Sequence, residues 1–195
     1  MITVRICVYG AASNIIDRKY IKAAEELGEI MGKRGHGLVF GAGANGLMGA
    51  AARGMYKAGG EIIGVAPKFF NVDGVLFEHC TELLRPDTMR VRKQMLEELS
   101  DAYIITPGGI GTFDEFFEIL TLKQLARHRK AMAIFNIDGY YNKLLEALEF
   151  SIKEGFLNKE CLDLFKVFDN PEELVEYLEN YKEADIDIYK LKEIK

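Results

Sequence analysis

Short apolar runs alternate with amphipathic stretches along the whole of this 195-residue chain. Runs of four to seven apolar residues are typical of strands buried on both sides, whereas apolar residues spaced three and four apart indicate helices. The runs predict strands at residues 3–9, 37–40, 61–65, 102–106, 131–136 and 165–168. The spaced residues predict helices at 20–34, 47–58, 88–100, 112–128, 140–154 and 171–181.

This alternation predicts an α/β fold in which a parallel sheet has helices on both faces. Such sheets bind ligands at the carboxyl ends of their strands, near the point where the strand order reverses. Residues 68–87 are irregular and predict a long loop with room for one short strand. We expect a single domain over residues 1–182, followed by a charged extension over residues 183–195.

The composition is that of a globular domain, with 49% hydrophobic and 28% charged residues. The net charge of −5 argues against a nucleic-acid binder, because such a protein needs a basic face to neutralise phosphates. No apolar run is long enough to span a membrane, and the first residues do not have the pattern of a signal peptide. Three widely spaced cysteines, Cys7, Cys80 and Cys161, predict neither a disulfide framework nor a zinc site, and they favour the reducing cytoplasm.

Glycine is over-represented, with 19 residues, and part of the excess lies where predicted strands end. The three turns contain Gly10, residues 41–46 and residues 107–111. The second turn, GAGANG, matches the dinucleotide-binding pattern G-x-G-x-x-G. In dinucleotide-binding proteins this pattern follows the first strand, and an acidic residue near the end of the next strand binds the ribose. Here the turn follows the second strand, and the acidic residue, Glu61, lies at the start of the next one. Two interpretations remain for this turn: a phosphate cradle made of backbone N–H groups, and a tight turn that needs glycine for close packing.

The third turn continues into PGGIGTFDE, residues 107–115. Its glycines let a ligand approach the backbone, and a helix that starts here directs N–H groups and a positive dipole end at an anion. Glu115 has two interpretations. It is a carboxylate placed for chemistry, or it is the last residue of a capping box in which Thr112 caps the helix and Glu115 reaches back to the Thr112 N–H.

Three cations, Arg90, Arg92 and Lys93, crowd the predicted helix start at Thr88. Positive charge is unfavourable near the N-terminus of a helix. The run is either a solvated basic face or a site for an anionic ligand such as a phosphate, which would offset the repulsion.

The pairing of PGGIGT-x-x-E (residues 107–115) with M-x-x-R-K (Met89, Arg92, Lys93) resembles the LOG, or "lonely guy", family. Its members are cytokinin riboside 5′-monophosphate phosphoribohydrolases, formerly labelled lysine decarboxylase-like. VFGAGANGLMG, GVAPK, LKQLARHRK and FNIDGYYNKLLE resemble further family segments, so the similarity extends over roughly residues 4–180.

The resemblance implies a Rossmann-like, doubly wound fold and a homodimer with active sites at the subunit interface. The implied reaction hydrolyses the N-glycosidic bond of a nucleoside 5′-monophosphate to the free base and ribose 5-phosphate, with no metal and no cofactor. By position, Arg92 and Glu115 match the catalytic residues. The expected substrate-binding residues are Gly10, Gly41, Gly43, Met89, Lys93, Gly108, Gly109, Ile110, Gly111, Thr112, Phe113, Asp114 and Thr121.

Two departures from the family pattern concern the base pocket: Arg90 stands where the family has His, and Leu122 where it often has Trp. They make plain AMP or another purine monophosphate an alternative substrate. A non-catalytic nucleotide or molybdenum-cofactor carrier of the same fold is the alternative function. We disfavour lysine decarboxylation, because no segment presents a persuasive pyridoxal-phosphate lysine, and a dehydrogenase, because it rests on GAGANG alone.

Overall fold

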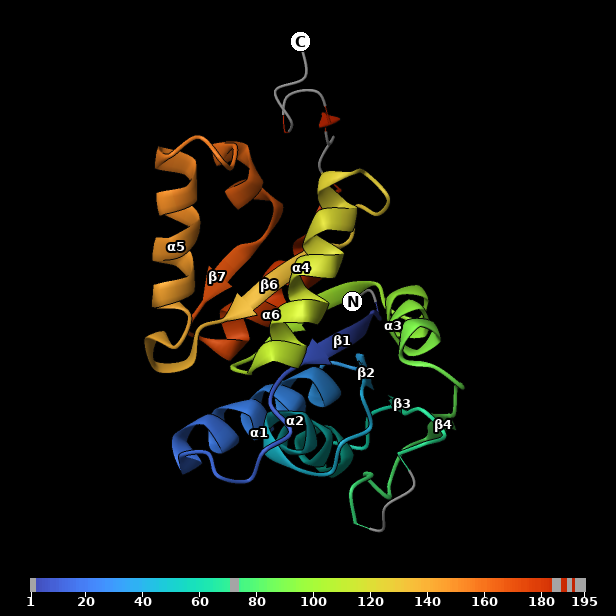
Figure 1. The fold of residues 1–195 in the computed structure, drawn as a ribbon. Coiled ribbons are helices and arrows are strands. Elements are labelled where there is room, and N and C mark those ends of the chain that lie inside the picture. Colours follow the sequence, from blue (N-terminus) through green and yellow to red (C-terminus); the bar gives the residue numbers. More distant parts are fainter. Residues whose placement is uncertain (1–2, 71–73, 184–186, 189–190, 192–195) are drawn as a thin grey trace.

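The computed structural model describes residues 3–70, 74–183, 187, 188 and 191. Strands and helices alternate in it as the sequence pattern predicts (Figure 1). The strands are β1 (Arg5–Tyr9), β2 (Gly37–Phe40), β3 (Ile62–Val65), β4 (Glu82–Leu84), β5 (Ala102–Ile105), β6 (Ala131–Phe135) and β7 (Lys166–Phe168). The helices are α1 (Arg18–Lys33), α2 (Gly46–Lys57), α3 (Met89–Glu98), α4 (Ile110–Gln124), α5 (Asn142–Lys153) and α6 (Pro171–Asn180), with 3-10 turns η1 (Ile137–Gly139) and η2 (Lys159–Leu164).

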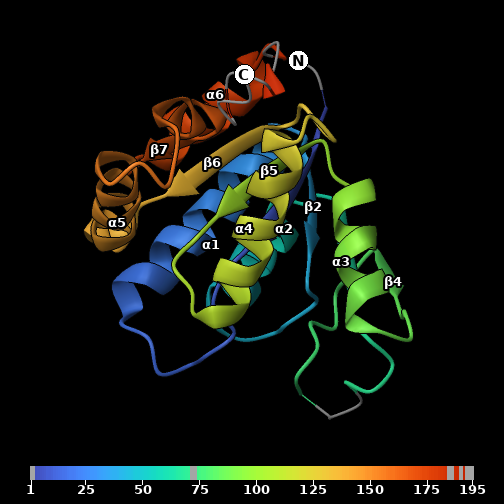
Figure 2. The same ribbon diagram turned by 45° about the horizontal axis from the view of Figure 1, so that its top comes forward.

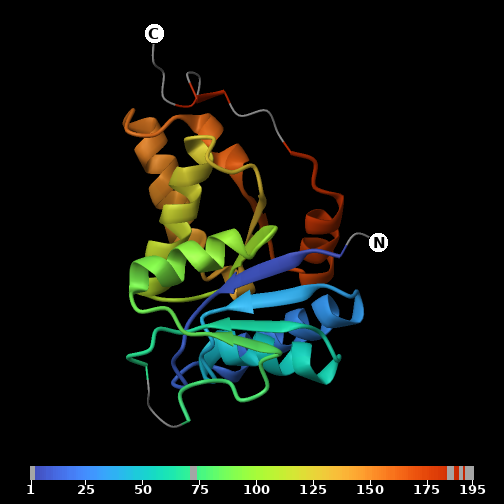
Figure 3. The same cartoon turned by 90° about the vertical axis from the view of Figure 1, so that its right-hand side faces the viewer.

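The strands that the structure describes form one seven-stranded sheet in the order β4-β3-β2-β1-β5-β6-β7. Every neighbouring pair is parallel, and Figure 3 shows the first strands side by side. The chain winds outward from β1 to β4 and then returns to the other side of β1 with β5. The carboxyl ends of β1 and β5 therefore meet where the winding reverses, which is where such sheets bind ligands. The α/β, doubly wound prediction is confirmed.

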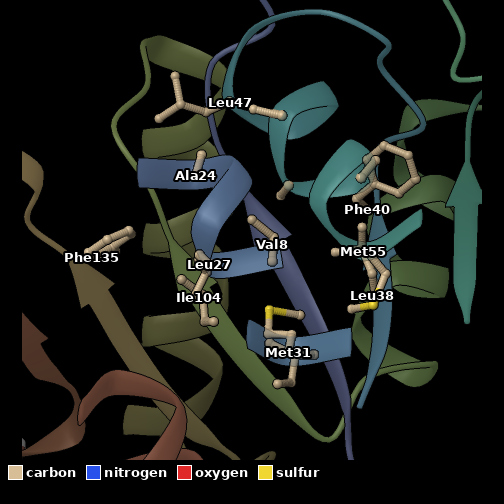
Figure 4. Close-up of a cluster of buried hydrophobic side chains, with 14 of the residues drawn as sticks. Val8, Ala24, Leu27, Met31, Leu38, Phe40, Leu47, Met55, Ile104 and Phe135 are labelled. Carbon is tan, nitrogen blue, oxygen red and sulfur yellow. The ribbon is translucent and has the colours of Figure 1, made fainter. Parts of the chain in front are cut away.

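Successive side chains of each strand enter two separate hydrophobic cores. Val8, Leu38 and Ile104 pack under α1, α2 and α6 (Figure 4). Their neighbours Cys7 and Val39 pack on the opposite face, under α3, α4 and α5. Figure 2 shows α4 in front of the sheet and α1 behind it. Because helices cover both faces, the inner strands are apolar at nearly every position, which explains the unbroken apolar runs in the sequence.

Part of the glycine excess serves the contact between α1 and α2 rather than a ligand. A Cβ atom added to Gly28 would lie 2.0 Å from the carbonyl oxygen of Ala51, and one added to Gly54 would lie 1.9 Å from that of Glu25. Two helix backbones can approach this closely only where no side chain separates them.

Two places near the site test the sequence prediction: the ends of α4 differ from it, whereas the short strand in residues 68–87 agrees with it. Helix α4 begins at Ile110, two residues before the predicted start, and ends at Gln124 instead of 128. The short strand for which residues 68–87 leave room is β4, which pairs with β3 at the edge of the sheet. The earlier start of α4 places Thr112 inside the first turn rather than at the cap.

In the predicted extension, Leu191 is buried against Cys161 and Leu164. Residues 184–186, 189, 190 and 192–195 lie outside the described residues, and the boundary at 182/183 stays a prediction. Among the helices that the structure describes, none has both the length and the apolar character needed to cross a bilayer.

Candidate active site

A cavity of about 370 Å³ lies at the carboxyl edge of the sheet, between the turns that follow β1, β2 and β5. Eleven of the residues expected at the site line it: Gly10, Gly41, Gly43, Met89, Arg92, Lys93, Gly109, Gly111, Thr112, Asp114 and Glu115. They come from three turns and two helices that are distant in sequence, so the topology of the sheet brings them together.

Arg92 is buried in the wall of this cavity and held at two points. Its Nε donates to the carbonyl oxygen of Val65, the last residue of β3, at 3.1 Å. Its Nη1 donates to Glu115 Oε1 at 2.8 Å. Helix α3 presents Arg92 inward after the Thr88 hydroxyl caps the helix by accepting from the N–H of Val91 at 3.2 Å. The guanidinium group is therefore held in a fixed position in the cavity wall.

The carboxylate of Glu115 forms the other half of this buried pair, and only 11% of its side chain is exposed. Burial raises the pKa of Glu115, while the positive charge and hydrogen bond of Arg92 act in the opposite direction. A carboxyl group with a raised pKa in a cleft is the kind of group that exchanges protons during catalysis.

The capping box considered for Thr112 and Glu115 does not form. Gly109 is the N-cap residue of α4, no side chain caps this end, and the Glu115 carboxylate bonds to Arg92 instead. The reason is the earlier helix start, which carries Glu115 beyond reach of the cap and turns it toward α3.

The remaining cations of α3 have different surroundings. Lys93 Nζ lies 3.2 Å from Asp114 Oδ2 and 2.8 Å from Glu118 Oε2, and the hydrogen bond to Glu118 is the main cause of the raised pKa of Lys93. Lys93 and Asp114 line the cavity, whereas Arg90 is exposed outside its lining. Two of the three clustered cations therefore face the cavity.

The N-terminus of α4 opens into the cavity. The first-turn N–H groups of a helix have no partner within the helix, and two residues of the first turn of α4, Gly111 and Thr112, line the cavity. A Cβ atom added to Gly109 or Gly111 would meet nothing within 4 Å. This end of the helix thus offers open donors and a positive dipole end to an anion.

The N-terminus of α2, behind GAGANG, is closed by the protein. The carbonyl oxygen of Ala11 accepts from the N–H groups of Leu47 and Met48, at 2.8 and 3.4 Å. The side-chain oxygen of Asn14 accepts from Gly46 N at 3.3 Å. These N–H groups are not available to a phosphate, which favours the tight-turn interpretation of this segment. The turn borders the cavity through Gly41 and Gly43 instead.

Gly108 lies outside the cavity lining, and a Cβ atom added there would be 2.1 Å from the Thr112 hydroxyl oxygen. Ile110, Phe113 and Thr121 line a neighbouring open groove of about 580 Å³ on the outer face of α4. The groove and the cavity share Lys93 and Asp114, so these expected residues lie beside the site rather than within it.

Six further cavity residues were not expected from the sequence: Ala11, Ala12, Met48, Phe70, Val75 and Leu76. The two alanines follow the glycine at the end of β1, so their place in the chain was a usable signal. Leu76 was not predictable, because it reaches the cavity through an antiparallel bridge with Gly43, 33 residues earlier in the chain. Among the described residues, no group of three or more His, Cys, Asp or Glu side chains is arranged to hold a metal ion.

Known proteins resemble this chain over most of its length. Residues 48–178 match the model of the family described as "Possible lysine decarboxylase". A probable cytokinin riboside 5′-monophosphate phosphoribohydrolase of Oryza sativa subsp. japonica is 36% identical over 91% of this chain and 72% of its own length. A cytokinin riboside 5′-monophosphate phosphoribohydrolase of Arabidopsis thaliana is 35% identical over 91% of this chain and 82% of its own.

Solved structures share the fold at lower identity. The molybdenum cofactor binding protein of Rippkaea orientalis superposes with a TM-score of 0.70 at 22% identity, over 92% of this chain and 97% of the other. The molybdenum cofactor carrier of Chlamydomonas has a TM-score of 0.67 at 20% identity, over 93% and 100%. With identity of 35–36% to relatives over nine-tenths of its length, the chain belongs to the LOG family, within the group described as possible lysine decarboxylases.

Proposed function

We propose that this protein hydrolyses the N-glycosidic bond of a cytokinin or adenine nucleoside 5′-monophosphate and releases the free base and ribose 5-phosphate. The observation that carries the proposal is the buried pair of Arg92 and Glu115 in the wall of a cavity into which the N-terminus of α4 opens. The cavity supplies an anion site and a buried carboxylate a few residues apart. The relatives' names supply the nucleotide.

The 5′-phosphate fits the α4 end of the cavity. Backbone N–H groups of Gly111 and Thr112 and the ammonium group of Lys93 provide donors and positive charge there. Fixing the phosphate away from the reacting bond helps to hold the ribose in place, so that binding energy contributes to the rate.

Glu115 acts on the ribose. Cleavage of a glycosidic bond passes through a state with positive charge on the sugar ring, which a nearby carboxylate stabilises or supplies with an activated water. Arg92 holds the carboxylate in place through the 2.8 Å bond and favours its ionised form. The base would lie against the apolar part of the lining, which consists of Met48, Phe70, Val75, Leu76 and Met89.

The choice of base is part of this proposal. Arg90 lies outside the cavity lining, and Leu122 lines the neighbouring groove rather than the cavity. With Leu in place of the larger Trp, the groove side offers a different surface to a base substituent. We therefore include plain AMP among the substrates.

We further propose a cytoplasmic homodimer with the site at its interface. Ile110 and Phe117, two apolar side chains of the groove on α4, are 89% and 38% exposed. A second copy covering this groove would bury both side chains together with Thr121, which also lines the groove. The three cysteines, Cys7, Cys80 and Cys161, form no disulfide with one another, and the cytoplasm is the compartment that keeps thiols reduced.

The test incubates the purified protein with AMP, isopentenyladenosine monophosphate and other nucleotides, and measures free base and ribose 5-phosphate. We expect release from at least one of them. The variant Glu115→Gln should lower that release by at least about a hundredfold, because it removes the charge while retaining the shape of the side chain.

Glu98→Gln is the matched control, because Glu98 lies on α3 with Arg92 but is exposed, bonds to Gln94 at the surface and lines neither the cavity nor the groove. It should keep release within about fivefold of the parent protein. Tight nucleotide or cofactor binding without release from any substrate would contradict the enzyme and support the carrier alternative. Full activity in Glu115→Gln would remove Glu115 from the mechanism.

A further inference from the structure

Two adjacent tyrosines hold the backbone of the turn between β5 and α4. The hydroxyl of Tyr141 donates to the carbonyl oxygen of Thr106 at 2.7 Å, and the hydroxyl of Tyr140 donates to that of Gly108 at 2.7 Å. Both tyrosines come from the segment between β6 and α5, more than 30 residues along the chain. The two bonds grip the turn on either side of Pro107.

A third donor completes this arrangement. The N–H of Ala11, in the turn after β1, donates to the carbonyl oxygen of Pro107 at 3.0 Å. Three consecutive carbonyl groups, those of residues 106, 107 and 108, are therefore each held by a donor from outside the turn. We refer to these three bonds as the carbonyl clamp.

The tyrosines are themselves positioned. The side-chain oxygen of Asn136 accepts from Tyr141 N at 2.7 Å and so fixes the start of the segment that carries them. The ring of Tyr141 is buried and meets Phe113 of α4 edge-on, with 6.2 Å between ring centroids. The ring of Tyr140 meets Tyr20 of α1 edge-on at 6.1 Å. Both hydroxyl groups thus reach the turn from a fixed support.

The clamp determines which backbone groups face the cavity. A peptide unit that points its carbonyl oxygen at a donor points its N–H the other way, because the two groups lie on opposite sides of the planar peptide bond. The held carbonyl groups of Pro107 and Gly108 therefore set the directions of the N–H groups of Gly108 and Gly109. The unit after Thr106 has no N–H, because its nitrogen belongs to Pro107, so the bond from Tyr141 fixes the chain where the turn begins. Carbonyl oxygens carry partial negative charge and repel an anion. Holding three of them away leaves the N–H groups that follow, at the N-terminus of α4, to meet the ligand.

We propose that Tyr140 and Tyr141 are positioning residues that pre-orient the phosphate-binding turn through the carbonyl clamp. The inference rests on the proposed function for the identity of the anion, a phosphate monoester. Tyr140 is 42% exposed, so packing of its ring does not by itself explain the place of its hydroxyl. Neither residue touches the reacting bond, and each acts through the backbone of the turn.

The experiment titrates inorganic phosphate into the isotope-labelled protein and follows the backbone amide signals of Ile110, Gly111 and Thr112 by NMR. Tyr140→Phe and Tyr141→Phe remove only the hydroxyl groups. Because one hydrogen bond is worth a modest amount, we expect each variant to bind phosphate about three- to tenfold more weakly. In nucleotide hydrolysis the same factor should appear in KM, with kcat changed less.

Tyr103→Phe is the matched control. Tyr103 is a fully buried tyrosine on the same side of the sheet, and its hydroxyl donates to a carbonyl oxygen far from the turn, that of Glu97 at 3.4 Å. It should leave phosphate affinity unchanged, whatever its effect on the melting temperature. A second control is adenosine, which has no phosphate and should bind equally well to the parent and both clamp variants.

Unchanged phosphate affinity in folded Tyr140→Phe and Tyr141→Phe overturns the proposal, as does equal weakening of phosphate and adenosine binding. Should Tyr141→Phe fail to fold, the partly exposed Tyr140 decides the question. The experiments test the carbonyl clamp and the proposed function independently of each other. Phosphate binding that depends on the tyrosines, in a protein that hydrolyses no nucleotide, supports the clamp and contradicts the enzyme.

Discussion

Two glycine-rich turns of this protein look alike in sequence and have opposite roles at the edge of the sheet. GAGANG (residues 41–46) leads into α2, and PGGIG (residues 107–111) leads into α4. The first helix end gives its N–H groups to Ala11 and Asn14. The second helix end has its first turn at the cavity, and the carbonyl groups of the turn before it accept hydrogen bonds from Tyr140 and Tyr141.

The comparison teaches that glycine content does not identify an anion site. An anion site requires that the first backbone N–H groups of the helix are not already hydrogen-bonded to other parts of the protein. At α2 the positive φ of Gly46 (61°) brings the chain directly against Ala11, so glycine serves the fit of protein to protein. At α4 the space beside Gly109 and Gly111 is empty of protein, so glycine leaves room for a ligand.

The largest expected effect contrasts these two roles. A Cβ atom at Gly46 would lie 2.2 Å from the Ala11 carbonyl oxygen in a backbone conformation that alanine disfavours. Gly46→Ala should therefore lower the free energy of unfolding by about 3 kcal/mol. Gly111→Ala should raise it by up to about 1 kcal/mol, because the methyl group enters open space within a helix. Urea denaturation measures the free energy of unfolding of both variants. An equal decrease in the two would contradict the different roles assigned to the two turns.

A second effect concerns Gly41, the first residue of GAGANG, which lies against Arg92 of the buried Arg92–Glu115 pair. A Cβ atom at Gly41 would lie 2.1 Å from Arg92 Nη2. Gly41→Ala should displace the guanidinium and lower kcat about ten- to a hundredfold in the nucleotide assay. Gly43→Ala adds a methyl group to the same turn and the same cavity, but this group meets the flexible end of Met48 at 3.2 Å and not Arg92, so it measures the effect of a methyl group without displacement of the guanidinium. Equal activity of the two variants would show that Arg92 tolerates the shift.

The smallest expected effect is on pH dependence. Glu115 must be ionised to act, so kcat should fall as the pH drops through its pKa, and burial places that fall above the ordinary range for a glutamate. Asp114 raises the pKa of Glu115 by like-charge repulsion. In Asp114→Asn the acid limb of the kcat profile should therefore move to lower pH. Movement to higher pH, or an acid limb at the ordinary glutamate pKa in the parent protein, would contradict this account.

The secondary structure could be predicted well because it depends on local patterns. Each predicted strand and helix has a counterpart in the fold, since burial on both faces makes the strands apolar throughout. The errors are at ends. The start of α4 was placed at Thr112 because T-x-x-E is a capping pattern, but the N-cap is Gly109, which has no side chain to recognise.

The composition of the site was largely readable from motifs, whereas its contacts were not. Arg92 and Glu115 were both expected, on separate segments, but nothing local shows that they bond to each other across 23 residues of chain. Phe70 and Leu76 come from an irregular segment without a motif. Leu76 is placed by pairing with the turn after β2, and Arg85 donates to the carbonyl oxygen of Phe70 at 3.2 Å.

The chain's own pattern is sufficient for the parallel sheet, the family and the choice of Arg92 and Glu115 as candidate site residues, because each depends on nearby residues or on a short motif. It does not show that the N–H groups behind GAGANG are bonded within the protein, whereas those behind PGGIG lie at the cavity. That difference arises when the turns after β1, β2 and β5 meet at one edge of the sheet. There Ala11 accepts from one helix end and donates to the turn before the other. Hydrogen bonds between segments so far apart form only once the sheet has brought them together.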